Sequence, residues 1–168
     1  MKARAKTNSD LTVSKVIATP IGKLTLVASP KGLQQVIFGA KKLPGTKSAS
    51  TKAKLFLTQT ERQLREYFAG DRKKFSIKLD ISGTEFQKSV WLALNKTSYG
   101  KTISYAQQAR LVRRPKAFRA VGSANGKNPV AIVLPCHRVI ASSGTLGGYG
   151  GGLAIKRKLL SLENSKTL

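Results

Sequence analysis

The first part of the chain has its apolar residues in short runs that turn residues separate. Three runs, at residues 13–18, 23–28 and 33–38, have the length and the apolar, β-branched content that are typical of strands. The turns between them contain Pro-Ile-Gly and Pro-Lys-Gly, which are residue types that favour tight turns. A fourth run, 75–82, alternates apolar and polar residues and predicts a further strand. The pattern therefore predicts a small antiparallel sheet.

A helical period separates the third run from the fourth. Residues 40–54 are small, polar and basic, and they predict a surface loop. In 55–70, by contrast, Leu57 and Leu64 recur at helical spacing together with an aromatic pair, until a glycine ends the pattern. We therefore expect residues 1–80 to form an N-terminal α/β structural domain, and we find no chemical motif in it.

Helical spacing dominates the second half of the chain. An N-cap at Thr84 opens a predicted helix that runs to about Asn95. Two shorter helices follow, at 104–111 and 115–125, the first with a serine cap and the second with proline in its first turn. Two short helices joined by a basic linker are typical of a helix-turn-helix. We therefore predict a second, mainly helical domain at 83–168.

The second of these short helices has an unusual surface. Small residues form one face, and Arg119 projects near the middle of the helix. Glycine costs a helix interior about 1 kcal/mol relative to alanine, so Gly122 suggests that something approaches closely. Two interpretations remain open from this pattern: contact with a ligand, and tight packing against another helix.

The remaining segments predict a strand, a loop and a helix. Residues 128–140 are mostly apolar and predict a buried strand. Residues 142–152 are rich in glycine and predict a loop. Residues 154–164 have the spacing of a basic amphipathic helix.

Charge narrows the choice of partner. The chain has 31 Lys and Arg against 7 Asp and Glu, a formal net charge of +24. An excess of this size favours a polyanion partner, because neutralising phosphates supplies most non-specific affinity for nucleic acid. The charge alone does not separate DNA from RNA or from an anionic membrane. No apolar run approaches the roughly 18 residues that cross a bilayer, and the basic N-terminus lacks a signal-peptide core. We therefore expect a soluble intracellular protein.

One cysteine and one histidine stand side by side in 134-LPCHRVI-140. A single cysteine cannot form an internal disulfide, and the pair falls short of a structural zinc site. Taken alone, Cys136 is most simply a buried small apolar residue. However, the neighbouring His137 and Arg138 are expected to lower its thiol pKa, and the preceding proline places it at the edge of an element. Cys136 is therefore a candidate nucleophile.

Glu163 is the only acidic residue after Glu85, which makes it a candidate partner for His137, although an exposed helix charge is the alternative. In an extended segment successive side chains point apart, so a water molecule would have to connect Cys136 to His137. A thiol hydrolase normally brings a distant histidine to its cysteine, and this chain has no second histidine. The residues therefore disfavour peptide hydrolysis.

The second half resembles a known family. The run 134-LPCHRVI-140, an Asn-Pro eight residues before the cysteine and 147-GGYGGGLAIKRKLLSLE-163 are similar to the O6-alkylguanine-DNA alkyltransferases, also called methylated-DNA–protein-cysteine methyltransferases. The likeness includes 103-ISYAQQA-109 and 115-PKAFRAVGSAN-125, and it runs from about residue 83 to 163. It implies an RNase H-like α/β domain followed by a winged helix-turn-helix, and DNA repair by direct damage reversal.

The resemblance implies a chemical role for five residues. Cys136 would accept the alkyl group of O6-alkylguanine, and also of O4-methylthymine, in one irreversible event per molecule without a cofactor or a metal. The thiol proton would pass through water to His137, which Glu163 would orient. Tyr105 would hydrogen-bond guanine N3 as charge develops on the leaving base. Asn128 would tie the recognition helix to the active-site segment.

The resemblance also implies a way of binding DNA. Arg119 would fill the stack as the lesion rotates out of the duplex through the minor groove. The other residues that would contact DNA or line the pocket are Gly122, Asn125, Arg138, Val139, Tyr149, Gly150 and Gly151. Lys156 would be a structural partner near the site. Position 150 is glycine where some relatives have serine. The expected partner is double-stranded DNA and not a membrane, with the protein a monomer that can cluster on DNA, in the cytoplasm of a prokaryote or the nucleus of a eukaryote.

Two other functional classes remain to be tested. A lesion sensor would bind alkylated DNA without transfer, although sensors of this kind lack the acceptor cysteine. A regulator that uses only the helix-turn-helix would leave the Cys-His-Glu set and the glycine-rich loop unexplained.

Overall fold

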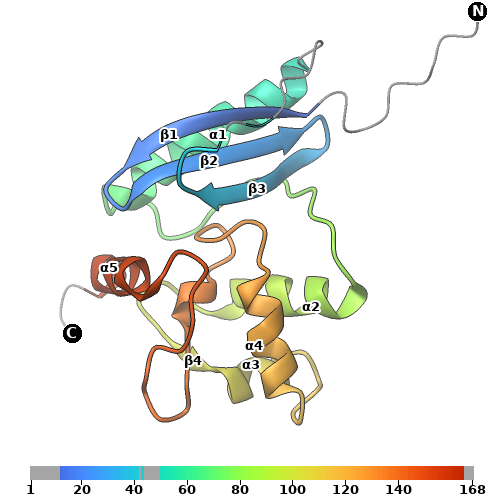
Figure 1. Cartoon of the computed structure of the whole chain (residues 1–168), viewed down its shortest axis with the longest axis vertical. Helices are drawn as coiled ribbons and strands as arrows, with labels where there is room; N and C mark the ends of the chain where they lie inside the picture. Colours follow the sequence, from blue (N-terminus) through green and yellow to red (C-terminus); the bar gives the residue numbers. More distant parts are fainter. Residues whose placement is uncertain (1–11, 42, 44–49, 165–168) are drawn as a thin grey trace, which may run out of the picture. The chain divides into compact units, whose positions relative to one another are not determined.

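The computed structural model describes residues 12–41, 43 and 50–164. The chain forms two compact units, Met1–Ile81 and Ser82–Leu168 (Figure 1). Among the described residues, no helix combines the length and the apolar character that a membrane span requires.

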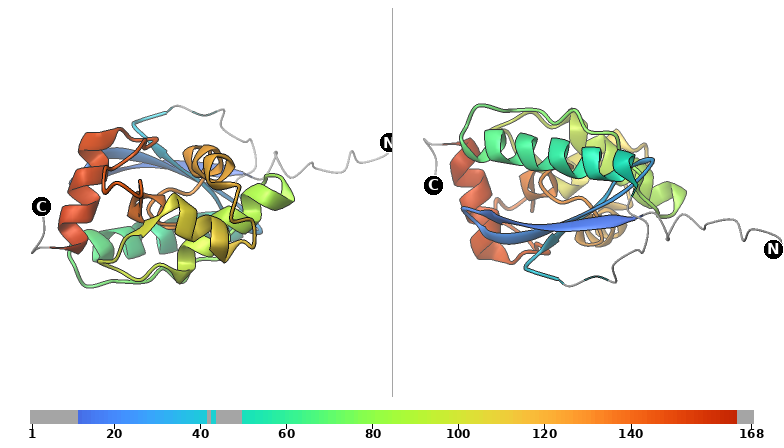
Figure 2. Two further views of the ribbon diagram at one scale, coloured as in Figure 1. Left: turned by 90° about the horizontal axis from the view of Figure 1, so that it is seen from below. Right: turned by 90° about the horizontal axis from the view of Figure 1, so that it is seen from above.

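The first unit is a three-stranded antiparallel sheet with one helix on it. The strands β1 (Val13–Thr19), β2 (Gly22–Ser29) and β3 (Gly32–Phe38) lie in chain order, which confirms the three predicted strands. The helix α1 (Thr51–Phe68) lies along one face of the sheet (Figure 2). It begins four residues before the predicted start, because the side chain of Ser50 accepts a hydrogen bond from the backbone N–H of Ala53.

The turn between β2 and β3 requires glycine. A Cβ atom at Gly32 would lie 2.5 Å from the carbonyl oxygen of Lys78, well inside van der Waals contact. This close approach allows the segment that contains Leu79 to pair with the start of β3. Leu33 donates a hydrogen bond to the carbonyl of Lys78 and accepts one from the N–H of Asp80, both at 2.8 Å.

The strand predicted at 75–82 is wrong, because this single pairing of Leu33 with Leu79 is an isolated bridge. Side chains of α1 take the backbone groups that a strand would use. Gln63 accepts a hydrogen bond from the N–H of Ser76 at 2.8 Å and donates one to its carbonyl at 3.1 Å, and Gln59 donates another at 3.0 Å. The segment is therefore held by a helix at Ser76 and meets the neighbouring strand β3 only at the Leu33 bridge.

The second unit is mainly helical, as predicted. The helix α2 (Glu85–Ala93) starts in a capping box of Thr84 with Gln87 and continues into the 3₁₀ helix η2 (Leu94–Lys96). The helix α3 (Tyr105–Leu111) starts in a second capping box, of Ser104 with Gln107. These caps confirm Thr84 and Ser104 as the residues at which the two helices begin.

The helices α3 and α4 (Phe118–Gly126) pack together as a helix-turn-helix. Pro115 lies in the turn before α4 rather than in its first turn. Two buried contacts fix α4. The indole N–H of Trp91 donates to the carbonyl of Ala124 at 2.7 Å, and the side-chain amides of Gln108 and Asn125 bond to each other at 2.6 and 3.2 Å. The fold class predicted from the sequence is confirmed in both units.

The buried strand predicted at 128–140 is wrong in form, although its residues are buried. Residues 129–134 make a compact turn in which the N–H of Leu134 donates to the carbonyl of Val130 at 3.0 Å. Ile132 has a φ of 75°, which no strand residue adopts. An apolar turn that is buried on all sides has the same hydrophobic pattern as a buried strand, so the sequence could not separate them.

A short helical turn carries the Cys-His pair. The 3₁₀ helix η3 (Cys136–Arg138) leads into β5 (Val139–Ile140), which pairs in parallel with β4 (Ile103–Ser104). A glycine-rich loop then connects to the helix α5 (Leu153–Glu163), whose inner face buries Leu159 and Leu160. The backbone at Cys136 is thus helical and not extended as expected.

Candidate active site

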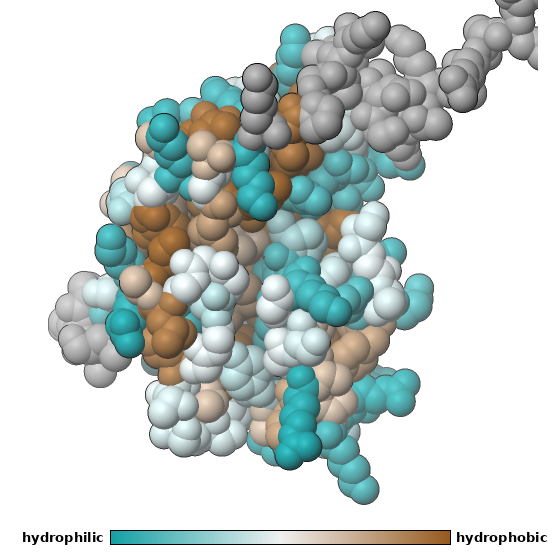
Figure 3. All heavy atoms as spheres, in the orientation of Figure 1, coloured by the Kyte–Doolittle hydropathy of each residue, from teal (hydrophilic) through white to brown (hydrophobic). Residues whose placement is uncertain are grey.

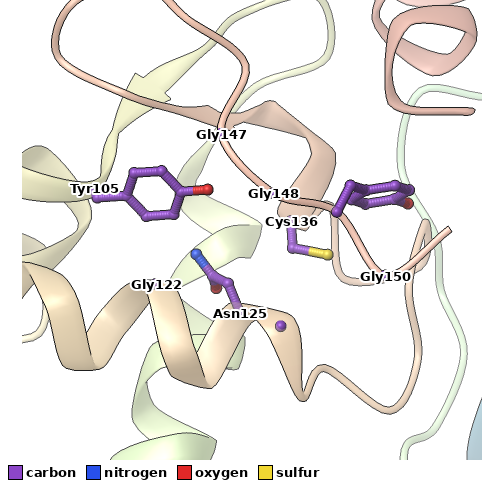
Figure 4. Close-up of a pocket in the computed structure, with 9 residues that line it drawn as sticks. Tyr105, Gly122, Asn125, Cys136, Gly147, Gly148 and Gly150 are labelled. Carbon is purple, nitrogen blue, oxygen red and sulfur yellow. The ribbon is translucent and has the colours of Figure 1, made fainter. Parts of the chain in front are cut away.

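A pocket of about 490 Å³ opens onto Cys136. Three parts of the second unit line it: the start of α3, one face of α4 and the glycine-rich loop. Figure 4 shows the side chains of Tyr105 and Asn125 and the thiol of Cys136 around the same space. The lining residues are Tyr105, Gly122, Asn125, Gly126, Cys136, Gly147, Gly148, Tyr149 and Gly150.

The thiol of Cys136 is only 7% exposed. Burial raises its pKa, while a hydrogen bond from Asn128 and the positive charge of Lys156 act in the opposite direction. The lowering expected from His137 and Arg138 is therefore wrong for the protein without a ligand. At neutral pH the sulfur is a protonated thiol, and a reaction at this atom needs a base.

His137 is fully buried and points its Nε2 at Glu163. The distance from Nε2 to Oε1 of Glu163 is 2.7 Å. The other ring nitrogen, Nδ1, is buried and has no hydrogen-bond partner among the described residues. Burial lowers the pKa of His137, against the opposing effect of Glu163, so the imidazole is neutral at pH 7. With its N–H on Nε2, the ring presents a free lone pair at Nδ1.

Glu163 is held from two sides. Arg138 binds it through two nitrogens, Nε to Oε2 at 2.8 Å and Nη2 to Oε1 at 3.0 Å. The backbone N–H of Gly100 also donates to Oε2, at 3.2 Å. Burial alone would raise the pKa of Glu163, but the hydrogen bonds from His137 and Arg138 outweigh it and lower the pKa to about 2. The carboxylate is therefore ionised throughout the neutral range.

Arg138 is buried inside this cluster. Besides Glu163, its Nη1 donates to the carbonyl of Thr97 at 2.7 Å, and the guanidinium lies 5.7 Å from the ring centre of Tyr99. The geometry thus gives Arg138 a different place from the one expected. Its donors are used within the protein, and it positions Glu163 instead of facing DNA.

Asn128 closes the turn that precedes Cys136. Its side chain donates to the carbonyl of Leu134 at 2.8 Å and accepts from the N–H of Val130 at 3.1 Å. Asn128 comes directly after the end of α4, so these bonds connect that helix to the segment that carries the thiol. This is the connection that the sequence predicted for Asn128.

Tyr105 and the glycine-rich loop meet at Gly147. A Cβ atom at Gly147 would lie 2.8 Å from the phenol oxygen of Tyr105, and its φ of +67° also favours glycine. The same ring lies over Gly122 of α4, where a Cβ atom would make an ordinary contact at 3.7 Å. Burial raises the pKa of Tyr105, so the phenol keeps its proton and can donate a hydrogen bond.

Tyr149 forms the wall of the pocket next to the histidine. Its ring meets that of His137 edge to face, with centroids 6.5 Å apart. Gly150 lines the same pocket, whereas Gly151 follows it in the turn before α5. The loop therefore brings Tyr149 and Gly150 to the thiol, as the sequence predicted, and leaves Gly151 outside the lining.

Lys156 joins the thiol segment to the glycine-rich loop. It is fully buried on α5, and its ammonium group donates to the carbonyl of Val139 at 2.6 Å and to the carbonyl of Leu146. Burial lowers the pKa of Lys156 to about 8. Val139 was expected to contact DNA or line the pocket, and its carbonyl is thus already engaged by Lys156.

The predicted DNA-facing residues of α4 separate into two groups. Arg119 is exposed, and its guanidinium lies 5.9 Å from the ring centre of Phe118. Gly122 lines the pocket. Asn125 also borders the pocket, but its amide is bonded to Gln108. The helix α4 therefore packs tightly against a neighbouring helix on one side and borders an open pocket on another. Both interpretations of its small residues thus apply.

Sequence reasoning missed several residues of this site. Gly126, Gly147 and Gly148 line the pocket without having been singled out, and Thr97 and Gly100 support the Glu163 cluster through their backbones. The glycine content of 142–152 was a visible signal for the loop residues. The backbone donors and acceptors had no signal, because any residue type can supply them.

The fold and the site define a helix-turn-helix protein whose second helix borders a pocket with a buried cysteine thiol. Comparison with known proteins identifies the family within this class. Residues 85–165 match the family model "6-O-methylguanine DNA methyltransferase, DNA binding domain", and residues 13–81 match "6-O-methylguanine DNA methyltransferase, ribonuclease-like domain". The chain belongs to the 6-O-methylguanine DNA methyltransferase family.

Individual relatives are similar over most of both chains. A methylated-DNA–protein-cysteine methyltransferase of Methanosarcina acetivorans is 47% identical over 152 residues, which are 89% of this chain and 97% of the relative. One from Mycobacterium tuberculosis is 43% identical over 152 residues, covering 90% and 92%. The crystal structure of Mycobacterium tuberculosis OGT in complex with DNA superposes with a TM-score of 0.81 at 43% identity, again covering 90% and 92%.

Proposed function

We propose that this protein repairs DNA by transferring the alkyl group of O6-alkylguanine to Sγ of its own Cys136. The observation that carries the proposal is the buried Cys136–His137–Glu163 arrangement at the base of a pocket bordered by a helix-turn-helix. Family membership and the DNA-bound relative support DNA as the partner. The net charge of +24 supports it independently, because a polyanion neutralises such a surface.

The reaction is a displacement at the alkyl carbon. The thiol loses its proton through a water molecule to Nδ1 of His137, the nitrogen that has no partner among the described residues. The sulfur forms a bond to the alkyl carbon as the bond from that carbon to guanine O6 breaks. The electron pair of the broken bond stays on the base. Guanine then takes up one proton, which balances the proton that the thiol lost, so the products are an S-alkyl cysteine and normal guanine.

The surroundings of His137 suit this proton transfer. Ionised Glu163 accepts the N–H of Nε2 and stabilises the imidazolium that forms. Burial keeps the imidazole neutral and able to accept a proton before the reaction, and the positive charge of Arg138 acts in the same direction. At pH 7 the thiol thus holds the proton that it has to lose, and the imidazole is in the neutral form that can accept it.

The leaving base needs stabilisation, because guanine without a proton donor is a poor leaving group. Tyr105 projects into the same pocket as the thiol and keeps its phenol proton. We assign it the hydrogen bond to guanine N3, where negative charge develops. A base held in this pocket has to leave the duplex first, and we assign the filling of the gap to Arg119, which is exposed on α4.

The chemistry of the product limits each protein molecule to one reaction, because Cys136 is not regenerated. An S-alkyl thioether lacks the leaving group that makes a thioester hydrolysable, so each molecule reacts once. The test is to mix the protein with an excess of duplex that contains O6-methylguanine and to count the guanines restored. The proposal predicts a plateau at one per protein molecule, and continued turnover or the absence of any repair would contradict it.

A further inference from the structure

Phe118 is a large apolar side chain in an exposed position. It is the first residue of α4 and is 45% exposed. Its neighbours in the helix-turn-helix include the exposed basic residues Lys116 and Arg119, and Figure 3 shows hydrophilic side chains projecting around α3 and α4. Its ring is therefore accessible to a partner that binds at α4.

The position of Phe118 on the helix relates it to the pocket. Gly122, Asn125 and Gly126 line the pocket, and they stand four, seven and eight residues after Phe118. This spacing places Phe118 on the same helical face, roughly 6 Å along the axis from Gly122, or about one turn. Phe118 therefore lies on the helical face that borders the pocket, outside the residues that line it.

Phe118 also contacts Arg119. The guanidinium carbon of Arg119 lies 5.9 Å from the ring centre, within the range of a cation–π interaction. Such a contact restricts a long, exposed side chain that otherwise has many rotamers. The ring and the guanidinium are thus close enough to act as a pair.

We propose that Phe118 is a wedge that acts with Arg119 on DNA. In this inference, which rests on the proposed function, the ring abuts the base step beside the extruded nucleotide and holds the Arg119 guanidinium toward the vacated space. Proteins that bend DNA through the minor groove often insert apolar side chains between base steps, and base–aromatic stacking tolerates any sequence. Phe118 touches no reacting atom and is a positioning residue.

The test compares two substrates that differ only in the need for extrusion. One is a duplex that contains O6-methylguanine, and the other is free O6-benzylguanine, which enters the pocket without leaving a stack. Phe118→Ala is expected to slow transfer from the duplex about tenfold, as loss of one stacking contact does. It is expected to leave the rate with the free base within about twofold, because the thiol and its base are unchanged.

Three further variants sharpen the result. Phe118→Trp keeps an aromatic face and is expected to restore the duplex rate. Leu92→Ala, which removes another exposed apolar side chain (51% exposed, on α2), is the matched control and is expected to change neither rate. In Phe118→Ala/Arg119→Ala the losses on the duplex are expected to be less than multiplicative, because the two residues act as a pair.

Two outcomes would overturn the inference. An unchanged duplex rate in Phe118→Ala would show that the ring does not contribute, and an equal loss on both substrates would assign it to the chemistry or to folding. Alanine favours a helix, and the site is exposed, so the variant is expected to fold. Failure of the unmodified protein to react with either substrate would instead reject the proposed function, so the two failures are distinguishable.

Discussion

The imidazole of His137 and the carboxylate of Glu163 face each other at 2.7 Å, both side chains almost completely removed from solvent. The two residues are 26 positions apart and come from η3 and α5. Their contact fixes which ring nitrogen carries the proton and leaves Nδ1 as the acceptor. The reactivity that we assign to Cys136 depends on this one relationship.

Replacing Glu163 by glutamine is expected to destabilise the protein by about 3 kcal/mol at neutral pH, because it leaves buried Arg138 without its charge partner. Chemical denaturation measures the difference. Glu66→Gln is the matched control, since Glu66 also pairs with two arginines, Arg62 and Arg72, but near the surface. We expect it to cost less than about 1 kcal/mol. An equal loss in both variants would contradict the importance of the buried cluster.

The difference in stability between the unmodified protein and Glu163→Gln should depend on pH. The folded-state pKa of Glu163, about 2, lies below its ordinary value of 4.5. A lowered carboxyl pKa stabilises the fold above the ordinary value, and this stabilisation is lost as the pH falls from 4.5 toward 2. The gap in unfolding free energy between the unmodified protein and Glu163→Gln should therefore shrink over this window. A gap that stays constant with pH would count against an ionised Glu163.

The transfer rate should also report the state of His137. Burial lowers its pKa below 6.5, so the imidazole remains the neutral acceptor at and above that pH. We expect the single-turnover rate to be lost with falling pH only below 6.5, as the ring takes up a proton. Rate measurements across this range with the free-base substrate avoid effects of pH on DNA binding. A rate that declines already from neutral pH downward would argue against a buried neutral histidine.

Adding a methyl group at two positions of the glycine-rich loop distinguishes backbone strain from a clash with Tyr105. Gly147→Ala would place its Cβ atom 2.8 Å from the phenol oxygen of Tyr105, whereas Gly144→Ala would meet nothing within 4 Å. Both glycines have positive φ, at 67° and 86°, so both variants bear a similar backbone cost. We expect a loss of transfer on the order of tenfold or more in Gly147→Ala alone. Equal rates in the two variants would remove Tyr105 from the account.

The salt dependence of DNA binding tests whether the basic residues of the helix-turn-helix contact phosphates. Five basic residues lie between Arg110 and Arg119, and all are exposed. If they neutralise phosphates, the logarithm of the DNA-binding constant should fall with the logarithm of salt with a slope of about −4 or steeper. Arg114→Gln should reduce that slope by about one, whereas Lys54→Gln on α1 should leave it in place. A nearly flat dependence would exclude an electrostatic footprint at the helix-turn-helix.

The sequence predicted the elements that have a period and a cap. The three strands of the first unit follow from short apolar runs between turn residues, and the helices that begin after Thr84 and Ser104 follow from helical spacing and side-chain caps. The strands expected at 75–82 and 128–140 were predicted incorrectly, because side chains take backbone groups that a strand would pair. Gln63 binds Ser76 from α1, and Asn128 closes the turn that it begins. Such side-chain bonds leave no periodic pattern.

The candidate site shows the same division. The Cys136–His137 pair and its link to Glu163 could be inferred because each residue type is scarce in that half of the chain. The burial that raises the pKa of the thiol could not be inferred, and neither could the use of Arg138 inside the protein. Both depend on how α5 packs against η3, which a local motif does not specify.

The most direct test of the central claim is the mass of the intact protein after incubation with a duplex that contains O6-methylguanine. The account predicts a single increase by the mass of one CH₂ group, located on the peptide that contains Cys136, and no increase in Cys136→Ala. An unchanged mass with tight binding to the lesion would make the protein a sensor. An increase that persists in Cys136→Ala would place the acceptor elsewhere and contradict the account.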